Sequence, residues 1–348
     1  MAETAPLLGQ HSTASITCVK KLAESTDLNS IPSYYAYYTN PAETMASDPM
    51  IQSPPSISRC SPPTTPIIGP KPSTTWTKPV INHGIPEELM RAVIDVTNEF
   101  FNLPEEEKPE FQPENVLEPI RYGTSFNTAK EKVFSWRDFL KVFVHPEFHC
   151  PDKPQPLREV LMEYCERSRQ VVRKLLKGIS QSLGIEETEM EKSLGLNSSL
   201  QIFIANLYPR CPDPDTAVGI APHSDQGLLT LLIQNQVAGL QLQHKGNWVN
   251  VTALPNSIMV VIGDHLEIFS NGKYKSVLHR AMVNNEKTRI SIAMFNGPSV
   301  DTVVSPAARL LRTQAPAYVP MKYKDYLMAQ QSNQLYAKSI LKRVRIQN

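Results

Sequence analysis

The stretch Ala221-Pro-His-Ser-Asp-Gln-Gly227 places a histidine and a carboxylate two residues apart, and the interpretation of the chain starts from it. In an extended backbone the side chains of His223 and Asp225 leave the same face. A second histidine, His279, follows 54 residues after Asp225. Two imidazoles and one carboxylate on one face of a metal leave three positions open, and this ligand set is typical of non-haem Fe(II) centres. The sequence therefore predicts a metal site made of His223, Asp225 and His279.

A His-x-Asp pair alone is more often part of a polar loop than of a metal site. The context of the second histidine strengthens the prediction, because Val277, His279 and Ala281 alternate onto one face of a strand-like run. A zinc hydrolase could use the same three ligands. It would need a nearby general base, and the sequence holds no His-Glu-x-x-His motif.

Arg289-Ile-Ser291 begins 10 residues after His279 and predicts an anion-binding strand. Alternation puts Arg289, Ser291 and Phe295 on one face. The planar fork of arginine suits one end of a dicarboxylate, and the serine hydroxyl can add a hydrogen bond. An Arg-x-Ser pair in a strand is otherwise solvent-facing or salt-bridged. We predict that Arg289 and Ser291 bind a dicarboxylate and that Phe295 stacks against a flat substrate.

Residues 199–208 form another strand-like run, in which Asn206 and Tyr208 share a face with Ile202 and Ile204. If that face points inward, Asn206 and Tyr208 reach toward the metal. Further short runs with turns at intervals of about 8–12 residues predict a β-barrel or jelly roll.

Longer stretches resemble the plant soluble 2-oxoglutarate- and Fe(II)-dependent dioxygenases, the group that includes flavanone 3-hydroxylase, flavonol synthase and gibberellin oxidases. The resemblance runs from about residue 81 to the C-terminus, with a short piece at Ser30-Ile-Pro32. Its motifs are specific for the family and unspecific for the substrate. They are Asn206-Leu-Tyr-Pro-Arg-Cys-Pro212, His223-Ser-Asp-Gln-Gly-Leu-Leu-Thr-Leu-Leu232, Gly239-Leu-Gln-Leu242, Trp248-Val-Asn-Val251, Asn271-Gly-Lys-Tyr-Lys-Ser-Val-Leu-His-Arg-Ala281 and Thr288-Arg-Ile-Ser-Ile-Ala-Met-Phe295.

The resemblance implies an α+β fold: a double-stranded β-helix (jelly-roll) core with flanking helices and a long scaffold helix. It implies Fe(II) as cofactor, 2-oxoglutarate and O2 as co-substrates, and ascorbate as a reductant. Tyr208, with Asn206, would contact the co-substrate. The reaction would hydroxylate or desaturate a small specialised metabolite of flavonoid or phenolic type, and it would yield succinate and CO2.

Two alternatives to this function stay open at the level of sequence. A relative that oxidises an amino acid without 2-oxoglutarate also uses Arg-x-Ser, so the motif alone does not fix the co-substrate. A metal-binding family member with impaired catalysis is the other alternative, because the segment before residue 81 departs from the family pattern.

Five segments are expected along the chain: an N-terminal arm (1–50), a Pro-rich segment (51–80), an N-terminal dioxygenase helical region (81–198), the Fe(II)/2-oxoglutarate barrel (199–299), and a C-terminal helix and tail (300–348). Aromatic residues at 34–38 either cover an edge of the core or belong to a loose tail. The basic stretch 338–345 either folds near the mouth of the active site, as in the family, or is solvated.

The Pro-rich segment is unusual, with eight prolines between Pro54 and Pro79 and no acidic residue between Asp48 and Glu87. Its composition is that of a disordered linker, whereas the resemblance requires a strand, a helix and a second strand here. Shifting the codon frame by two bases permits a strand-like spelling of 52–61 and a helix-like spelling of 72–80. We therefore interpret residues 52–80 as an out-of-frame translation, which leaves the sheet without its first strands.

Strands over 122–126 and 136–144 are expected to cover the mouth of the barrel and to supply substrate contacts. The candidates are Tyr122, Ser125, Phe126 and Lys141. Helices are expected over 86–103, over 157–183 with Gly184 as a left-handed cap, and over 322–331. His83 is expected to be structural, and His244 and His265 to lie at the surface.

The net charge of +1 gives no argument for nucleic acid or for an anionic membrane surface. No apolar run reaches membrane-spanning length, and no basic start followed by an apolar run marks a signal peptide. The five cysteines are scattered, as expected of reduced thiols. The sequence predicts a cytoplasmic monomer that acts on a small molecule.

Overall fold

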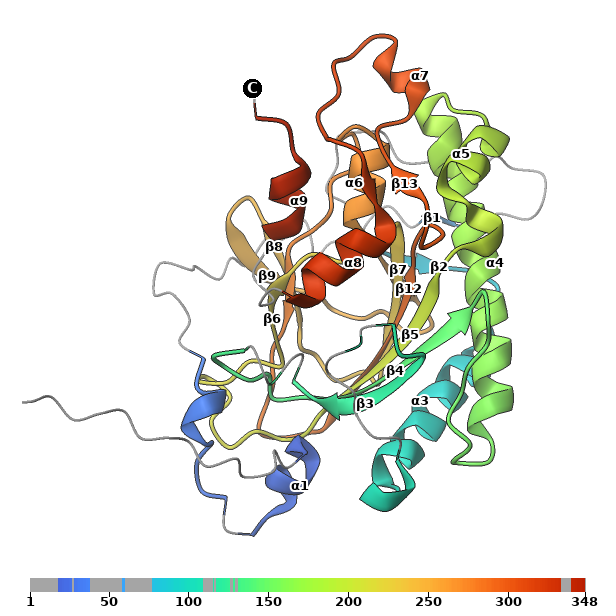
Figure 1. Ribbon diagram of the computed structural model, residues 1–348. Coiled ribbons are helices and arrows are strands. Elements are labelled where there is room, and N and C mark those ends of the chain that lie inside the picture. The colour runs from blue at the N-terminus through green and yellow to red at the C-terminus, as the bar shows by residue number, and fades with distance from the viewer. Residues whose placement is uncertain are drawn as a thin grey trace, which may run out of the picture.

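The computed structural model describes residues 18–26, 28–37, 58–59, 77–108, 115, 117–125, 128, 131–332 and 339–347 (Figure 1). The candidate contact Phe126 and most of the Pro-rich segment lie outside these residues. Within the described part of the chain, no helix is both long and apolar enough to cross a membrane.

Two facing sheets form the core, as expected for an α+β jelly roll. The larger one has the order β1 (Ser58–Arg59), β2 (Thr77–Ile81), β10 (Ile258–Ile262), β7 (Leu229–Gln234), β12 (Arg289–Asn296), β5 (Gln201–Tyr208), β4 (Asp138–His145), β3 (Ile120–Thr124). The smaller one has the order β6 (Ile220–His223), β11 (His279–Ala281), β8 (Leu240–His244), β9 (Asn247–Asn250). A separate pair joins β13 (Val303–Val304) to β14 (Met321–Lys322).

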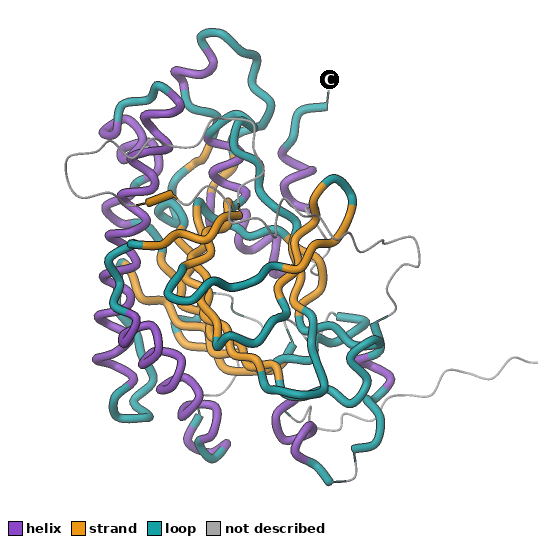
Figure 2. The backbone as a smooth tube through the Cα atoms, turned by 180° about the vertical axis from the view of Figure 1, so that it is seen from behind, coloured by secondary structure: helices purple, strands orange, loops and turns teal. Residues whose placement is uncertain are grey.

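Successive side chains on the strands of the large sheet point to opposite faces, as the predicted period of two requires. On β12, Ile290 and Ile292 belong to the main hydrophobic core, whereas Arg289, Ser291 and Phe295 line a cavity between the sheets. The same alternation holds on β5. The outer face is covered by α3 (Glu87–Asn102) and α4 (Leu157–Leu183), which stand beside the sheet in Figure 2.

The long helix α4 ends where the sequence predicts. Gly184 adopts φ 66°, in the left-handed region that glycine enters without strain. The amides of Gly184 and Ile185 donate to the carbonyls of Gln181 and Ser180, which closes the last turn.

The remaining helices are all shorter than α3 and α4. They are α1 (Val19–Glu24), α5 (Glu187–Leu194), α6 (Asp264–Phe269), α7 (Ala308–Leu311), α8 (Tyr323–Ser332) and α9 (Ser339–Val344), with 3-10 turns η1 (Ser33–Tyr35), η2 (Glu105–Glu107) and η3 (Leu196–Ser198).

The expectation that residues 52–80 leave the sheet without its first strands is wrong at two places. Strand β2 pairs antiparallel with β10, placing Val80 opposite Ile258, and the two-residue β1 pairs parallel with β2. Val80 is buried. Backbone pairing places few demands on side chains, so even a proline-containing stretch can form a short strand near a sheet edge.

The described part of the N-terminal arm, residues 18–26 and 28–37, packs on the core rather than forming a loose tail. The amides of Val19 and Lys20 donate to the two carboxylate oxygens of Asp138, at 2.8 and 2.7 Å. Tyr35 is fully buried, and its ring meets Trp136 edge-on at 5.0 Å. The arm therefore closes one end of the sheet pair.

The C-terminal tail also packs on the protein and is not a solvated tail. Ile340 and Leu341 of α9 are buried. The guanidinium of Arg345 lies 2.7 Å from a carboxylate oxygen of Glu267, a fully buried residue on α6. This ion pair fixes the tail against α6.

Candidate active site

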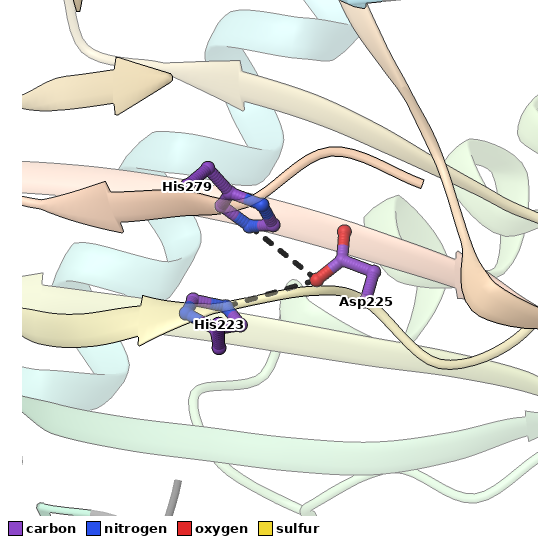
Figure 3. A group of neighbouring side chains, drawn as sticks. All are labelled: His223, Asp225 and His279. Atoms are coloured by element: carbon purple, nitrogen blue, oxygen red, sulfur yellow. Dashed lines mark ion pairs between the residues drawn. The ribbon is translucent and has the colours of Figure 1, made fainter. Parts of the chain in front are cut away.

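The three predicted metal ligands meet at the edge of the small sheet (Figure 3). His223 ends β6, His279 begins β11, and these two residues are paired across the strands. Asp225 lies on the loop after β6, and its Oδ1 is 3.7 Å from Nε2 of His223 and 3.4 Å from Nε2 of His279. One donor atom from each residue fits within a span of 4.8 Å, so the three side chains can hold one metal ion.

Backbone carbonyls orient both imidazoles. Nδ1 of His223 lies 2.8 Å from the carbonyl oxygen of Ala221, and Nδ1 of His279 lies 3.1 Å from that of Val277. A carbonyl oxygen only accepts, so each Nδ1 carries the proton. Nε2 of both rings is therefore left with its lone pair directed toward Asp225, as a metal ligand requires.

The electrostatics of the cluster reflect burial and mutual contact. Burial lowers the pKa of His223 to about 3, and the neighbouring His279 acts in the same direction. Burial also opposes charge on His279 and Asp225, but their mutual attraction prevails. The pKa of His279 is therefore raised, and that of Asp225 is held below its usual range.

The structure places the predicted anion clamp across the cavity, on the large sheet. Arg289 is buried, donates through Nη2 to Oε1 of Gln234 at 2.7 Å, and stacks over the ring of Tyr208 at 4.9 Å. Its Nε and Nη1 are buried and have no hydrogen-bond partner. Two unused donors of a buried guanidinium fit the carboxylate of a ligand. Ser291 lines the same cavity.

The other two predicted co-substrate contacts also line the cavity. Asn206 is paired with Ser291 across β5 and β12, and Tyr208 is paired with Arg289. Arg137 donates from Nη1 to Oδ1 of Asn206 at 3.0 Å and thereby fixes the amide.

The expected substrate contacts divide between the two faces of the large sheet. Lys141 and Phe295 line the cavity. Tyr122 instead packs against Phe100 and Phe101 of α3. The alternation of β3 points the preceding residue, Arg121, into the cavity, and sequence reasoning missed it.

Ser125 is also not among the cavity-lining residues that the structure describes. It is fully buried, with φ 57°, and its hydroxyl donates to Glu131 and accepts from the amide of Ser135. Its role in the structure is to hold the turn between β3 and β4.

The expectation that His265 lies at the surface is wrong, because this residue is fully buried behind the metal loop. Its Nδ1 accepts a hydrogen bond from the amide of Gly227 at 3.3 Å, and its ring lies between Tyr323 and Tyr326. A single histidine at the start of a short helix carries no periodic signal, so its burial could not be expected from the sequence.

Asp264 holds the metal loop from the same side. Its Oδ2 accepts from the hydroxyls of Ser224 at 3.0 Å and Tyr326 at 2.6 Å, and its amide donates to the carbonyl of Asp225. A Cβ on Gly263 would lie 2.4 Å from the carbonyl oxygen of Gly227, so this close approach needs glycine. The loop is thus fixed by α6 and, through Tyr326, by α8.

Comparison with known proteins gives two family matches. Residues 199–298 match the model of the 2OG-Fe(II) oxygenase superfamily. Residues 79–162 match a model described as non-haem dioxygenase in morphine synthesis N-terminal. The second match begins where the Pro-rich segment ends.

Similar proteins include two from Oryza sativa subsp. japonica. 2-oxoglutarate-dependent dioxygenase 19 is 45% identical over 269 residues, which are 77% of this chain and 80% of the relative. Flavanone 3-dioxygenase 2 is 39% identical over 253 residues, or 71% and 73%. A crystal structure of JOX2 in complex with 2OG, Fe and JA is 28% identical, with a TM-score of 0.81 over 95% of this chain and 98% of JOX2.

Proposed function

Because the chain belongs to the 2OG-Fe(II) oxygenase superfamily, we propose that it hydroxylates or desaturates a small phenolic or flavonoid-like specialised metabolite. The chain is a 2-oxoglutarate-dependent dioxygenase, an oxidoreductase that uses Fe(II). Two observations support the substrate class. One similar protein is named a flavanone dioxygenase. The cavity also presents three phenylalanine rings, those of Phe139, Phe143 and Phe295.

We further propose that His223, Asp225 and His279 hold the iron through Nε2, Oδ1 and Nε2. When bound, Fe(II) with 2-oxoglutarate and O2 supplies the oxidising power, and succinate and CO2 are the by-products. The chain's own residues orient the reactants. The carbonyls of Ala221 and Val277 keep both imidazoles in the tautomer that ligates through Nε2.

Arg289 is proposed to bind the far carboxylate of 2-oxoglutarate through Nε and Nη1, with help from the Ser291 hydroxyl. A guanidinium keeps its charge even when burial lowers its pKa, as it does for Arg289. Tyr208 and Asn206 complete the co-substrate pocket. Apolar residues on both sheets restrict water around the reacting C–H bond.

The single observation that carries this assignment is the pair of unused, buried donors on Arg289, placed across the cavity from the metal cluster. They fit an anionic co-substrate. The 45% identity to a protein named a 2-oxoglutarate-dependent dioxygenase favours 2-oxoglutarate over the mechanism in which an amino acid is oxidised without it.

We also propose a cytoplasmic monomer that binds neither nucleic acid nor membranes. The near-neutral net charge of +1 supports the absence of nucleic-acid and membrane binding, because electrostatic binding to polyanions requires an excess of basic residues.

The test is a substrate screen under controlled oxygen. The full chain is loaded anaerobically with Fe(II), 2-oxoglutarate and ascorbate, mixed with a panel of phenolic and flavonoid compounds, and then exposed to O2. Mass spectrometry should find a product heavier by one oxygen or lighter by two hydrogens, together with an equal amount of succinate. Product without succinate would contradict the use of 2-oxoglutarate. Iron binding without product or succinate across the panel would favour the catalytically impaired alternative.

A further inference from the structure

We infer that Arg137 is a positioning residue for the co-substrate. Its guanidinium holds the oxygen of the Asn206 amide, so that the amide nitrogen faces the cavity and donates to a carboxylate oxygen of 2-oxoglutarate. This inference rests on the proposed function, because it concerns how the same cavity binds 2-oxoglutarate.

Arg137 directly precedes β4 and belongs to a row of inward-facing side chains that crosses three strands. Two residues on, Phe139 is in register with Asn206 of β5. By alternation Arg137 therefore comes beside Tyr208, which is in register with Arg289 of β12. With adjacent strands about 4.8 Å apart, the Cα atoms of Arg137 and Arg289 are separated by roughly 10 Å. Arg137 is thus a second cation on the wall that carries the predicted anion clamp.

The charge of Arg137 forms no ion pair within the described part of the chain. The residue is only 6% exposed, and its guanidinium lies over the ring of Phe139 at 5.0 Å. Nη1 donates to Oδ1 of Asn206 at 3.0 Å, Nη2 donates to the backbone carbonyl of Ser125, and Nε has no hydrogen-bond partner. Burial lowers the pKa of Arg137, but a guanidinium keeps its charge. Burying a charge without an opposite charge destabilises a fold, so we looked for a task that the charge performs.

The turn between β3 and β4 is held without the guanidinium. The backbone carbonyl of Arg137 accepts from the amide of Ser125 at 2.9 Å and from the hydroxyl of Thr124 at 3.1 Å. The Ser125 hydroxyl adds its bonds to Glu131 and to the amide of Ser135. The bond from the guanidinium to Asn206 is therefore the one that reaches a proposed co-substrate contact.

That bond decides which end of the Asn206 amide faces the cavity. An amide has an acceptor end and a donor end, and a guanidinium only donates, so the oxygen must face Arg137. Nδ2 makes no hydrogen bond within the described residues, and Asn206 lines the cavity in register with Ser291. An amide turned the other way would present its oxygen to a carboxylate and repel it. Arg137 thereby makes Asn206 a donor for an anion.

Hydrogen bonding separates the roles of the two arginines. Arg289 leaves Nε and Nη1 unpaired and can donate both to a ligand. Arg137 already donates from both of its terminal nitrogens to the protein. The first therefore contacts the co-substrate, and the second acts on it through Asn206.

The experiment measures binding of 2-oxoglutarate to the full chain by isothermal titration calorimetry, with Fe(II) bound and oxygen absent. Asn206→Ala should raise the Kd at least about tenfold, the loss expected for one hydrogen bond to a charged group. Arg137→Met removes the guanidinium and keeps an unbranched side chain, and it should raise the Kd by a similar factor. Iron per chain should stay at the wild-type value in both variants. Arg91→Met removes an exposed arginine of α3 and should leave the Kd unchanged.

The double variant Arg137→Met/Asn206→Ala separates positioning from a general effect. If Arg137 acts through the amide, its replacement should change the Kd by no more than about twofold once the amide is gone. Losses that multiply would show that Arg137 acts independently of Asn206 and would overturn the inference. A wild-type Kd in folded Arg137→Met would also overturn it.

Asn206→Asp decides the matter if Arg137→Met does not fold, which a melting curve reveals. Aspartate keeps an oxygen for Arg137 and turns a second oxygen toward the cavity. It should weaken binding of 2-oxoglutarate at least as much as Asn206→Ala, without lowering the melting temperature. Binding as tight as in wild type would show that Asn206 serves only as a partner for Arg137, and the inference would be wrong.

The outcomes separate this inference from the proposed function. A wild-type chain that binds iron but no 2-oxoglutarate would overturn the proposed co-substrate, and the positioning role with it. Binding that is weakened by Arg289→Lys and unaffected by Arg137→Met would leave the dioxygenase function intact and overturn the positioning role alone.

Discussion

Replacing Arg289 with lysine keeps a positive charge on β12 and removes the planar guanidinium, which can donate two parallel hydrogen bonds. In the wild-type chain, Nη2 is bonded to Gln234 at 2.7 Å, and Nε and Nη1 are unpaired. Those two atoms are the donors available to the far carboxylate of 2-oxoglutarate. A lysine ammonium in that position can direct one bond to the ligand, so one charge-assisted hydrogen bond is lost. Such a bond contributes about 1.5–3 kcal/mol.

That loss converts to an increase of about 10- to 150-fold in the apparent KM for 2-oxoglutarate. The apparent KM for the organic substrate should change little, because the substitution removes a contact to 2-oxoglutarate and not one to the substrate. The assay measures succinate at varied 2-oxoglutarate with saturating substrate, and then the converse.

A second measurement separates binding from turnover. Equilibrium binding of 2-oxoglutarate to the Fe(II)-loaded variant without oxygen should weaken by the same factor. The loss of about 1.4 kcal/mol of binding free energy corresponds to a tenfold increase in KM. A KM for 2-oxoglutarate within about twofold of the wild-type value would therefore refute the proposal that Arg289 binds the far carboxylate. So would equal losses for both substrates, which would indicate a general distortion of the cavity.

Three further outcomes are expected. His279→Ala should lose bound iron and all succinate formation, because two ligands hold a metal far less well than three; iron per chain, measured by mass spectrometry, checks this, and full iron content would remove the assignment. Tyr326→Phe removes one partner of the buried Asp264 carboxylate and should lower the free energy of unfolding by about 1–3 kcal/mol, measured by urea denaturation; an unchanged midpoint would show that the contact contributes nothing. A chain with residues 52–80 restored to the alternate frame should have a higher melting temperature than this sequence. Equal melting temperatures would show that the Pro-rich segment is genuine. A cDNA that confirms one uninterrupted frame would show the same.

The sequence was most informative where a periodic pattern coincided with chemistry. Strand β12 alternates apolar residues with Arg289, Ser291 and Phe295, and the structure puts these three in the cavity as predicted. The metal cluster could be predicted equally well from the sequence, because a His-x-Asp pair at a strand end leaves few ways to orient the two side chains. The assignment of these residues to iron and 2-oxoglutarate stays a proposal.

Sequence reasoning failed where the answer depended on which face of a strand points inward. On β3, choosing Tyr122 rather than Arg121 is an error of one residue, and such a slip reverses every side chain of a strand. The stretch shows no alternation of apolar and polar residues that could fix the face. The burial of His265 could not be predicted from the sequence either, because it depends on packing against α8, which lies far along the chain from this residue.

The metal ligands and the cationic side chains that line the opposite wall of the cavity belong to different sheets. His223 and His279 are on the small sheet, whereas Arg121, Lys141 and Arg289 are on the large one. Substitutions on β3 and β4 can therefore reshape the recognised molecule without disturbing the oxidising centre. For an evolving lineage, this separation makes new substrates accessible through a few changes at one edge of the barrel. For an engineer, β3 and β4 are the strands to randomise, and the loop held by Asp264 is the one to leave unchanged.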